Sequence, residues 1–234
     1  MPLGTLMYGF DWMFFVIIGI FIISMVVQSK VNSTFKNYNK VLSKKNITGA
    51  QVSKQLLQDA GVYDVEIETN SGPALNNFYD PRKKVVSLSN EVYNSTSVAS
   101  IGIAAHECGH AIQHEDAYVF LKMREVIMPV VKVASFAAPI LFFIGFFMQL
   151  FDLLFIGLIL FGVTTLFYFI TLPVEYNASS RAIEILRNGN FLDTEELSMS
   201  KNVLSAAALT YVMAAIQSLA QLLRMLMLSG RRRR

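Results

Sequence analysis

Residues 104–114, AAHECGHAIQH, hold all three histidines of the 234-residue chain. His106 and His110 are four residues apart, so on an α-helix they share one face and lie about one turn from each other. Their imidazoles can then meet at one metal ion, and Glu107 can reach a water molecule held there. This HExxH pattern supplies two neutral nitrogen ligands for zinc and one carboxylate general base. The spacing therefore predicts a hydrolytic centre with one Zn²⁺ ion.

The two other polar residues of this stretch are not expected to be ligands. On a straight helix His114 lies about 12 Å from His106 along the axis, too far for both to join one tetrahedral ion together with His110. No glycine between His110 and His114 breaks the helix to bring the third histidine closer. We expect His114 to hydrogen-bond near the ligands or to lie at the surface. Cys108 points about 200° away from His106 and is expected in the core.

A third ligand must come from another part of the chain, and Glu175 is the strongest candidate. It lies in LPVEYNASSRA, directly after a long apolar run. On a helix, Ala178, Ser179 and Ala182 share its face. These small residues would allow close approach to the histidine helix, and Ser179 could hydrogen-bond to a ligand. The competing interpretation is that Glu175 only stabilises a helix N-terminus through the helix dipole.

The composition indicates a membrane protein. Hydrophobic residues make up 53% of the chain and the mean hydropathy is +0.45, whereas soluble domains are typically about 45–50% apolar. The excess forms long runs, and a membrane span needs about 20 such residues. We expect an anchor over residues 7–28, a helical hairpin over 130–172 and an apolar helix over 204–228. The last helix either spans the membrane or lies in its interface.

The basic residues predict the orientation of these segments. None precedes the first run and no small-residue cleavage site follows it, so we expect an uncleaved anchor rather than a signal peptide. Lysines and arginines are frequent in residues 29–129 and recur in 173–203, which the positive-inside rule places in the cytoplasm. If the last helix spanned, the arginines at 231–234 would lie outside. Because arginines outside would break the positive-inside rule, the interfacial alternative is favoured for the last helix.

The stretch KVNSTFKNYNKVLSKK, residues 30–45, has two possible structures. Val31, Phe35, Tyr38 and Leu42 recur at helical spacing among the lysines, which suits a basic amphipathic helix on an anionic membrane surface. A solvated, lysine-rich linker would have the same composition. The sequence leaves both open.

The polar residues 29–129 are predicted to form a small α+β domain. ITGAQVSKQLLQDAG predicts a helix with Thr48 as its cap. VEIET predicts a strand, and NNFYDPRKKVVSLS predicts a hairpin that turns at Asp80-Pro81. The histidine helix is expected to begin near residues 95–97. Residues 173–203 then form a separate cytoplasmic helix that carries the third zinc ligand.

These motifs resemble those of a known family. AAHECGHAIQH, two apolar runs and then LPVEYNASSRA are similar to the pattern of the YugP-like membrane zinc metallopeptidases. TGAQVSKQLL, FYDPRKKVVSLS and AALTYVMAA are similar too, so the likeness covers nearly the whole chain. More distantly, the arrangement resembles HtpX-type gluzincin proteases, which carry Asp where this chain has Ser179. The resemblance implies Glu107 as catalytic base and, as zinc ligands, His106, His110 and Glu175.

Together, these observations predict a mainly α integral membrane protein with a small α+β, gluzincin-like zinc peptidase domain split by a membrane hairpin. The expected function is a membrane-anchored zinc metalloendopeptidase in a bacterial cell membrane, with its active site facing the cytoplasm. The expected partners are the lipid bilayer and a membrane protein or membrane-proximal peptide as substrate, without nucleic acid. No oligomeric state follows. The candidates for stabilising the oxyanion are Tyr176, Arg181, His114 and Tyr79.

The alternative is a non-enzymatic membrane protein in which zinc only pins the polar domain to the hairpin. Glu107 discriminates between the two functions. A structural zinc site is closed by four protein ligands and has no use for a free carboxylate beside the metal.

Overall fold

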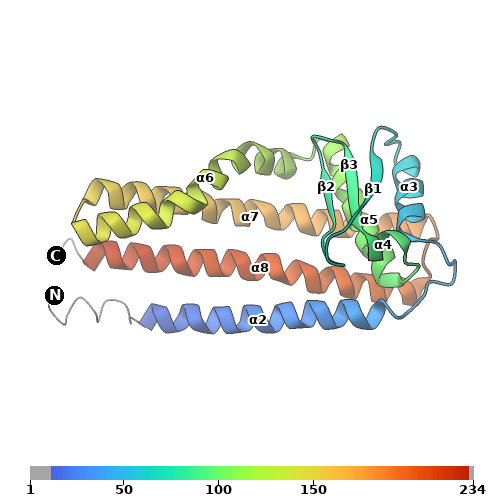
Figure 1. Cartoon of the computed structure of the whole chain (residues 1–234), viewed down its shortest axis with the longest axis horizontal. Coiled ribbons are helices and arrows are strands. Elements are labelled where there is room, and N and C mark those ends of the chain that lie inside the picture. Colours follow the sequence, from blue (N-terminus) through green and yellow to red (C-terminus); the bar gives the residue numbers. More distant parts are fainter. Residues whose placement is uncertain (1–11, 232–234) are drawn as a thin grey trace. The chain divides into compact units, whose positions relative to one another are not determined.

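The computed structural model describes residues 12–231, so residues 7–11 of the expected anchor and the last three arginines lie outside the described residues. The described elements, drawn in Figure 1, form two compact units. The site unit comprises residues 28–122 and 173–209, and the helical unit comprises the described residues of 1–27, 123–172 and 210–234. In chain order the elements are α2 (Trp12–Tyr38), α3 (Gly49–Asp59), β1 (Glu66–Asn70), β2 (Phe78–Asp80), β3 (Val85–Ser89), α4 (Asn90–Asn94), α5 (Val98–Glu115), α6 (Val119–Met148), α7 (Phe151–Asn188) and α8 (Thr194–Arg231).

The described chain is mainly helical, with a small three-stranded sheet. Four of its helices are long and apolar enough to cross a membrane, namely α2, α6, α7 and α8. This agrees with the prediction of membrane helices beside a small α+β region. By length and composition, α8 is among these candidates.

Helices α2 and α7 continue past the positions where the sequence predicts that they end. Residues 30–38 continue α2 instead of forming a separate surface helix or a linker, because Val31 and Phe35 are buried. Leu42 lies beyond the end of α2 and is exposed. Pro173 lies inside α7, which continues to Asn188. Proline removes one backbone donor from a helix, and a helix at membrane depth tolerates this where neighbouring groups satisfy the freed carbonyl.

The sheet of the site unit has the strand order β1-β3-β2, with β1 parallel and β2 antiparallel to β3. The predicted hairpin is present as β2 and β3, in the register Phe78↔Ser87 and Asp80↔Val85. Its turn is held by the Asp80 carboxylate, which accepts hydrogen bonds from the backbone N–H groups of Arg82 and Lys83. Lys84 then has a φ of 53°, in the left-handed region. The predicted strand VEIET corresponds to β1.

Helix α5 forms the centre of the site unit and packs against α3, α4 and the strands β2 and β3 (Figure 1). It begins after Ser97, whose hydroxyl accepts from the Ser100 N–H, as expected from the sequence. Fourteen of its 18 residues are buried, which fixes its rotation in the core. Helix α3 has the predicted cap at Thr48, which forms a complete capping box with Gln51.

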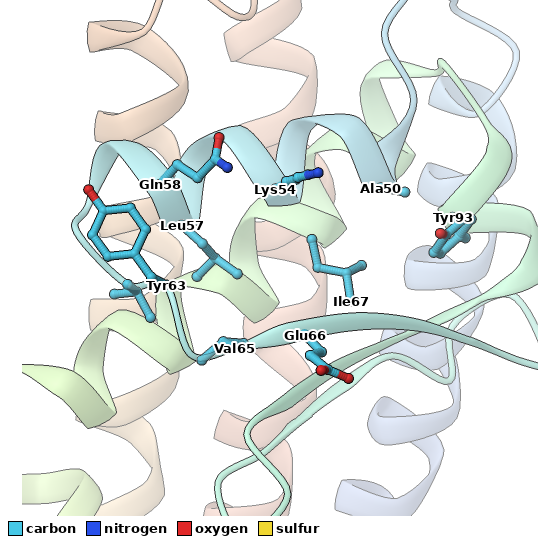
Figure 2. A pocket seen from close by; sticks show the side chains of 10 residues that line it. Ala50, Lys54, Leu57, Gln58, Tyr63, Val65, Glu66, Ile67 and Tyr93 are labelled. Atoms are coloured by element: carbon cyan, nitrogen blue, oxygen red, sulfur yellow. The ribbon is translucent and has the colours of Figure 1, made fainter.

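A cavity of about 440 Å³ lies between α3 and β1 (Figure 2). Lys54 and Leu57 line it from the helix, and Glu66 and Ile67 line it from the strand. None of the histidines lines this cavity. It is therefore separate from the predicted metal site.

In the helical unit, α6 and α7 form the tight hairpin predicted from QLFD. The turn at Gln149 has a φ of 62°, and the Leu150 N–H donates to the Gly145 carbonyl at 3.0 Å. A Cβ at Gly145 would lie 2.4 Å from the Leu154 nitrogen, so glycine is required for this close approach. Helix α8 contributes to the core of this unit, which comprises Phe142, Phe146, Leu154, Leu158, Met225 and Leu228.

Candidate metal centre

Three ligand-type side chains from α5 and α7 converge in the site unit. The Oε2 atom of Glu175 lies 3.4 Å from His106 Nε2 and 3.6 Å from His110 Nε2. All three ligand atoms lie within 4.8 Å of one another. A tetrahedral zinc ion with bonds of about 2.0–2.2 Å places its ligand atoms about 3.3–3.6 Å apart. The donor set and the two distances from the Glu175 carboxylate therefore fit zinc.

Each histidine is oriented by a hydrogen bond at its other ring nitrogen. His106 Nδ1 lies 3.1 Å from Ser179 Oγ, and His110 Nδ1 lies 3.0 Å from Gln113 Oε1. The amide nitrogen of Gln113 donates in turn to the Val174 carbonyl at 2.8 Å. A histidine that donates from Nδ1 presents the Nε2 lone pair to a metal. These contacts direct both Nε2 atoms toward Glu175.

Gln113 was missed by the sequence reasoning. It is fully buried, and besides the Val174 carbonyl it donates to Asn177 Oδ1 at 2.9 Å. It lies three residues after His110, the spacing at which two side chains meet on a helix. That spacing alone would have predicted a contact between Gln113 and His110. The link to α7 could not be found in the sequence, because it joins residues 61 positions apart.

Substitution of Ser179 by Ala is expected to lower zinc affinity by about 10–100-fold, because His106 loses the partner that fixes its ring. Ser180→Ala is the matched control, since Ser180 is the next residue of α7 and is exposed. Competition between the purified protein and a chromogenic chelator measures both affinities. Equal affinity in the two variants would show that the Ser179 contact does not position the ligand.

Glu175 lies in the middle of α7 and not at the start of a helix. The interpretation that it only stabilises a helix N-terminus is therefore wrong, because no N-terminus exists there. The side chain is buried, with 2% of its surface exposed. Burial of a charged carboxylate is costly unless charged or hydrogen-bonding groups compensate its desolvation. The two histidines provide this compensation for Glu175.

Small residues bring α7 close to α5. A Cβ at Gly109 would lie 2.7 Å from the backbone oxygen of Ala178, so a larger residue at 109 would push the helices apart. Ala178 and Ala182 are fully buried. The expected close approach of α7 to α5, along the small residues that share a helix face with Glu175, is thus present.

Glu107 is buried beside the ligand pair, with 7% of its surface exposed. Burial raises the pKa of its carboxyl group, while the neighbouring His106 and His110 and a backbone hydrogen bond with Tyr79 oppose that rise. A carboxylate with a raised pKa is the better proton acceptor near neutral pH. Glu107 does not belong to the group of three ligand atoms found among the described residues.

The other predicted residues are dispersed around the centre. His114 lies outside the ligand group, and its Nδ1 is 3.0 Å from the Tyr79 hydroxyl. Arg181 forms an ion pair with Asp116 and donates from Nε to Asn177 at 2.8 Å. Tyr176 is 49% exposed and lines a different cavity.

Cys108 lies on the opposite side of α5, as expected for a core residue. It is fully buried, and its thiol points to the Ser53 carbonyl at 3.7 Å. Burial raises the pKa of this thiol to about 12. A thiol that stays protonated and buried is a poor metal ligand.

Comparison with known proteins identifies the family. Residues 13–230 match the family model described as "Putative neutral zinc metallopeptidase". The chain is 45% identical over 211 residues to the protein described as "Putative membrane protease YugP" of Bacillus subtilis (strain 168), covering 89% of this chain and 93% of that protein. No solved structure matches. The predicted resemblance is confirmed: the chain belongs to the family described as putative neutral zinc metallopeptidases.

Proposed function

We propose that this protein is a membrane-anchored zinc metalloendopeptidase of the gluzincin type. The observation that carries the proposal is the convergence of His106, His110 and Glu175, in which the carboxylate lies at the ligand–ligand distance of a tetrahedral zinc site from both imidazoles. Glu107 is buried beside them. Three protein ligands leave one position open for water or substrate, as in catalytic zinc sites. Membership of a zinc metallopeptidase family supports peptide-bond hydrolysis.

Each residue of the centre has a distinct role in this proposal. The zinc ion, when bound, acidifies the attacking water and polarises the peptide carbonyl. Glu107 accepts the proton of that water and returns it to the leaving amine. Ser179 and Gln113 hold the two imidazoles in place from their Nδ1 atoms.

We assign stabilisation of the oxyanion to the pair of Tyr79 and His114. Their side chains hydrogen-bond to each other, and the Tyr79 backbone is hydrogen-bonded to Glu107. Arg181 is engaged by Asp116, and Tyr176 lines a different cavity. A hydroxyl or imidazole donor that reaches the carbonyl oxygen of the substrate can stabilise the negative charge that develops there.

The basic residues of segments 29–129 and 173–203 support a cytoplasmic membrane-surface enzyme with membrane proteins or membrane-proximal peptides as substrates. We propose an anchor over residues 7–28, peptidase segments over 29–129 and 173–203, and a membrane hairpin over 130–172. We further propose that residues 204–228 span the membrane beside the hairpin. Met225 and Leu228 share a buried cluster with hairpin residues, and α8 has the length and composition of a span.

Removal of zinc tests the proposed reaction. Detergent-purified protein with about one zinc per chain is expected to degrade an unstructured protein such as casein. A chelator should abolish the cleavage, and stoichiometric Zn²⁺ should restore it, because the chain holds the metal through only three side chains. Cleavage that survives complete removal of the metal would contradict a metallopeptidase mechanism.

Extended substrates are expected to pair with β2, which is an edge strand of the sheet and touches Glu107 through the Tyr79 backbone. Strand addition uses the backbone groups of the substrate. A peptide with N-methylated amides next to the cleaved bond should therefore be cut at least about tenfold more slowly than the unmodified peptide, since each lost hydrogen bond costs about 1 kcal/mol. Equal rates would count against strand addition.

A further inference from the structure

A second cavity of the site unit has a volume of about 630 Å³ and is formed by residues of α2, α7 and α8. This volume falls within the range of about 300–1,000 Å³ that is usual for small-ligand sites. None of the three candidate zinc ligands lines it, although Tyr176 does, and Tyr176 directly follows Glu175. The cavity is therefore distinct from the metal centre.

The lining of this cavity suits an anionic, oxygen-rich group. It contains one basic side chain, Lys30, and no acidic side chain among the described residues. Hydroxyl and amide groups supply further hydrogen-bond donors around it, from Thr34, Asn37, Tyr38, Tyr176, Asn202 and Ser205. The Asn202 amide donates to the Tyr38 hydroxyl at 3.2 Å, which links α8 to α2. Lysine, hydroxyl and amide donors together are the groups that hold a phosphate.

The cavity lies at the ends of the apolar runs. On α2, Lys30 comes three residues after Val27, the last residue of the apolar segment. On α7, Tyr176 comes four residues after Leu172, where the hairpin run ends. On α8, Leu209 immediately precedes the part assigned to the helical unit. Three helices thus place this lining at headgroup level, where tyrosine and lysine side chains are enriched in membrane proteins.

The polar and the apolar lining residues match the phosphate and the first acyl carbons of a phospholipid, respectively. Lys30 and the amide and hydroxyl groups offer contacts to a phosphate, whereas Ala206 and Leu209 add apolar surface. Lysines near anionic lipid are attracted by the negative potential of the leaflet surface. A lipid therefore satisfies both the charge and the depth of the cavity.

We propose that this cavity binds the headgroup of an anionic phospholipid, with the phosphate held at Lys30 and the start of the acyl chains directed to the apolar wall. The site is independent of zinc binding and of peptide hydrolysis. It gives the site unit a specific contact with lipid, beyond the general attraction of its basic residues.

Native mass spectrometry of the full chain in detergent tests this site with phosphatidylglycerol and phosphatidylcholine as probes. The wild-type protein is expected to retain phosphatidylglycerol in preference to phosphatidylcholine. Lys30→Gln should lower the retention of phosphatidylglycerol by about fivefold, the effect of one lysine near anionic lipid. Lys36→Gln is the matched control, because Lys36 is exposed on the same helix and does not line the cavity. Equal losses in both variants would overturn the proposal in favour of diffuse charge.

A steric variant tests occupancy without a change of charge. Ser205 is exposed and lines the cavity, so Ser205→Phe should fold and should fill the space. We expect it to lose phosphatidylglycerol as Lys30→Gln does, and normal retention would place the lipid elsewhere. Inorganic phosphate is the final arm of the test. If millimolar phosphate displaces the lipid completely, the cavity is a site for free phosphate and the lipid proposal fails.

Discussion

Glu107→Gln is expected to lower the rate of peptide hydrolysis by about 10²–10⁴-fold, the usual contribution of a general acid–base group. The amide has nearly the same shape as the carboxylate, so the buried packing around residue 107 should persist. Since Glu107 does not belong to the ligand group, the variant should keep its zinc. Casein degradation and zinc content, measured on the same preparation, check both parts of the prediction.

Glu115→Gln is the matched control for this experiment. Glu115 is the last residue of α5 and is exposed, so its loss of charge should leave cleavage unchanged. A Glu107→Gln variant that cleaves normally would rule out Glu107 as the base. If the wild type and the variant are both inert with zinc fully bound, the site is a structural staple and the proposed function is wrong.

The second large effect is expected for Glu175→Ala, which removes the proposed third ligand, the carboxylate of α7 that lies beside the two histidines. Two histidines alone do not complete a catalytic zinc site, so bound zinc should fall from about one ion per chain to near zero after dialysis. Hydrolysis should fall to background with it. Atomic emission analysis of the dialysed protein measures the metal, and circular dichroism establishes that the helices remain.

Glu184→Ala is the control for Glu175→Ala, since Glu184 is an exposed glutamate on the same helix. It should retain both zinc and activity. A fully zinc-loaded Glu175→Ala protein would show that the third ligand lies elsewhere in the chain. Zinc loss without a change in circular dichroism would assign the effect to ligation and not to folding.

Local patterns predicted the parts of the site that depend on helix periodicity and turn chemistry. The four-residue spacing of His106 and His110 places both on one face, whatever surrounds the helix. The hairpin at Asp80-Pro81 and the helix start at Ser97 follow from short-range hydrogen bonds that a few residues determine. The small-residue face of Glu175 also predicted that Ser179 could hydrogen-bond to a ligand, and Ser179 Oγ lies 3.1 Å from His106 Nδ1.

Features that depend on tertiary contacts could not be predicted in the same way. Pro173 indicates a helix end by its local effect, yet α7 continues through it. Val31 and Phe35 are buried in the site unit, which extends α2 beyond the apolar run. The Gln113 bridge joins residues far apart in sequence. In each case a distant part of the chain decides the outcome, and a single sequence does not reveal the distance between the partners.

The division of the proposed ligand set between α5 and α7 has a consequence for biogenesis. During synthesis, at about 5–20 residues per second, His106 and His110 emerge several seconds before Glu175. The apolar hairpin segment, residues 130–172, is made in that interval, so Glu175 can reach the histidines only after this segment has been synthesised. A nascent chain therefore has only two of the three proposed zinc ligands. With the proposed ligand set, proteolytic activity would begin only after the segment that follows the hairpin has been made.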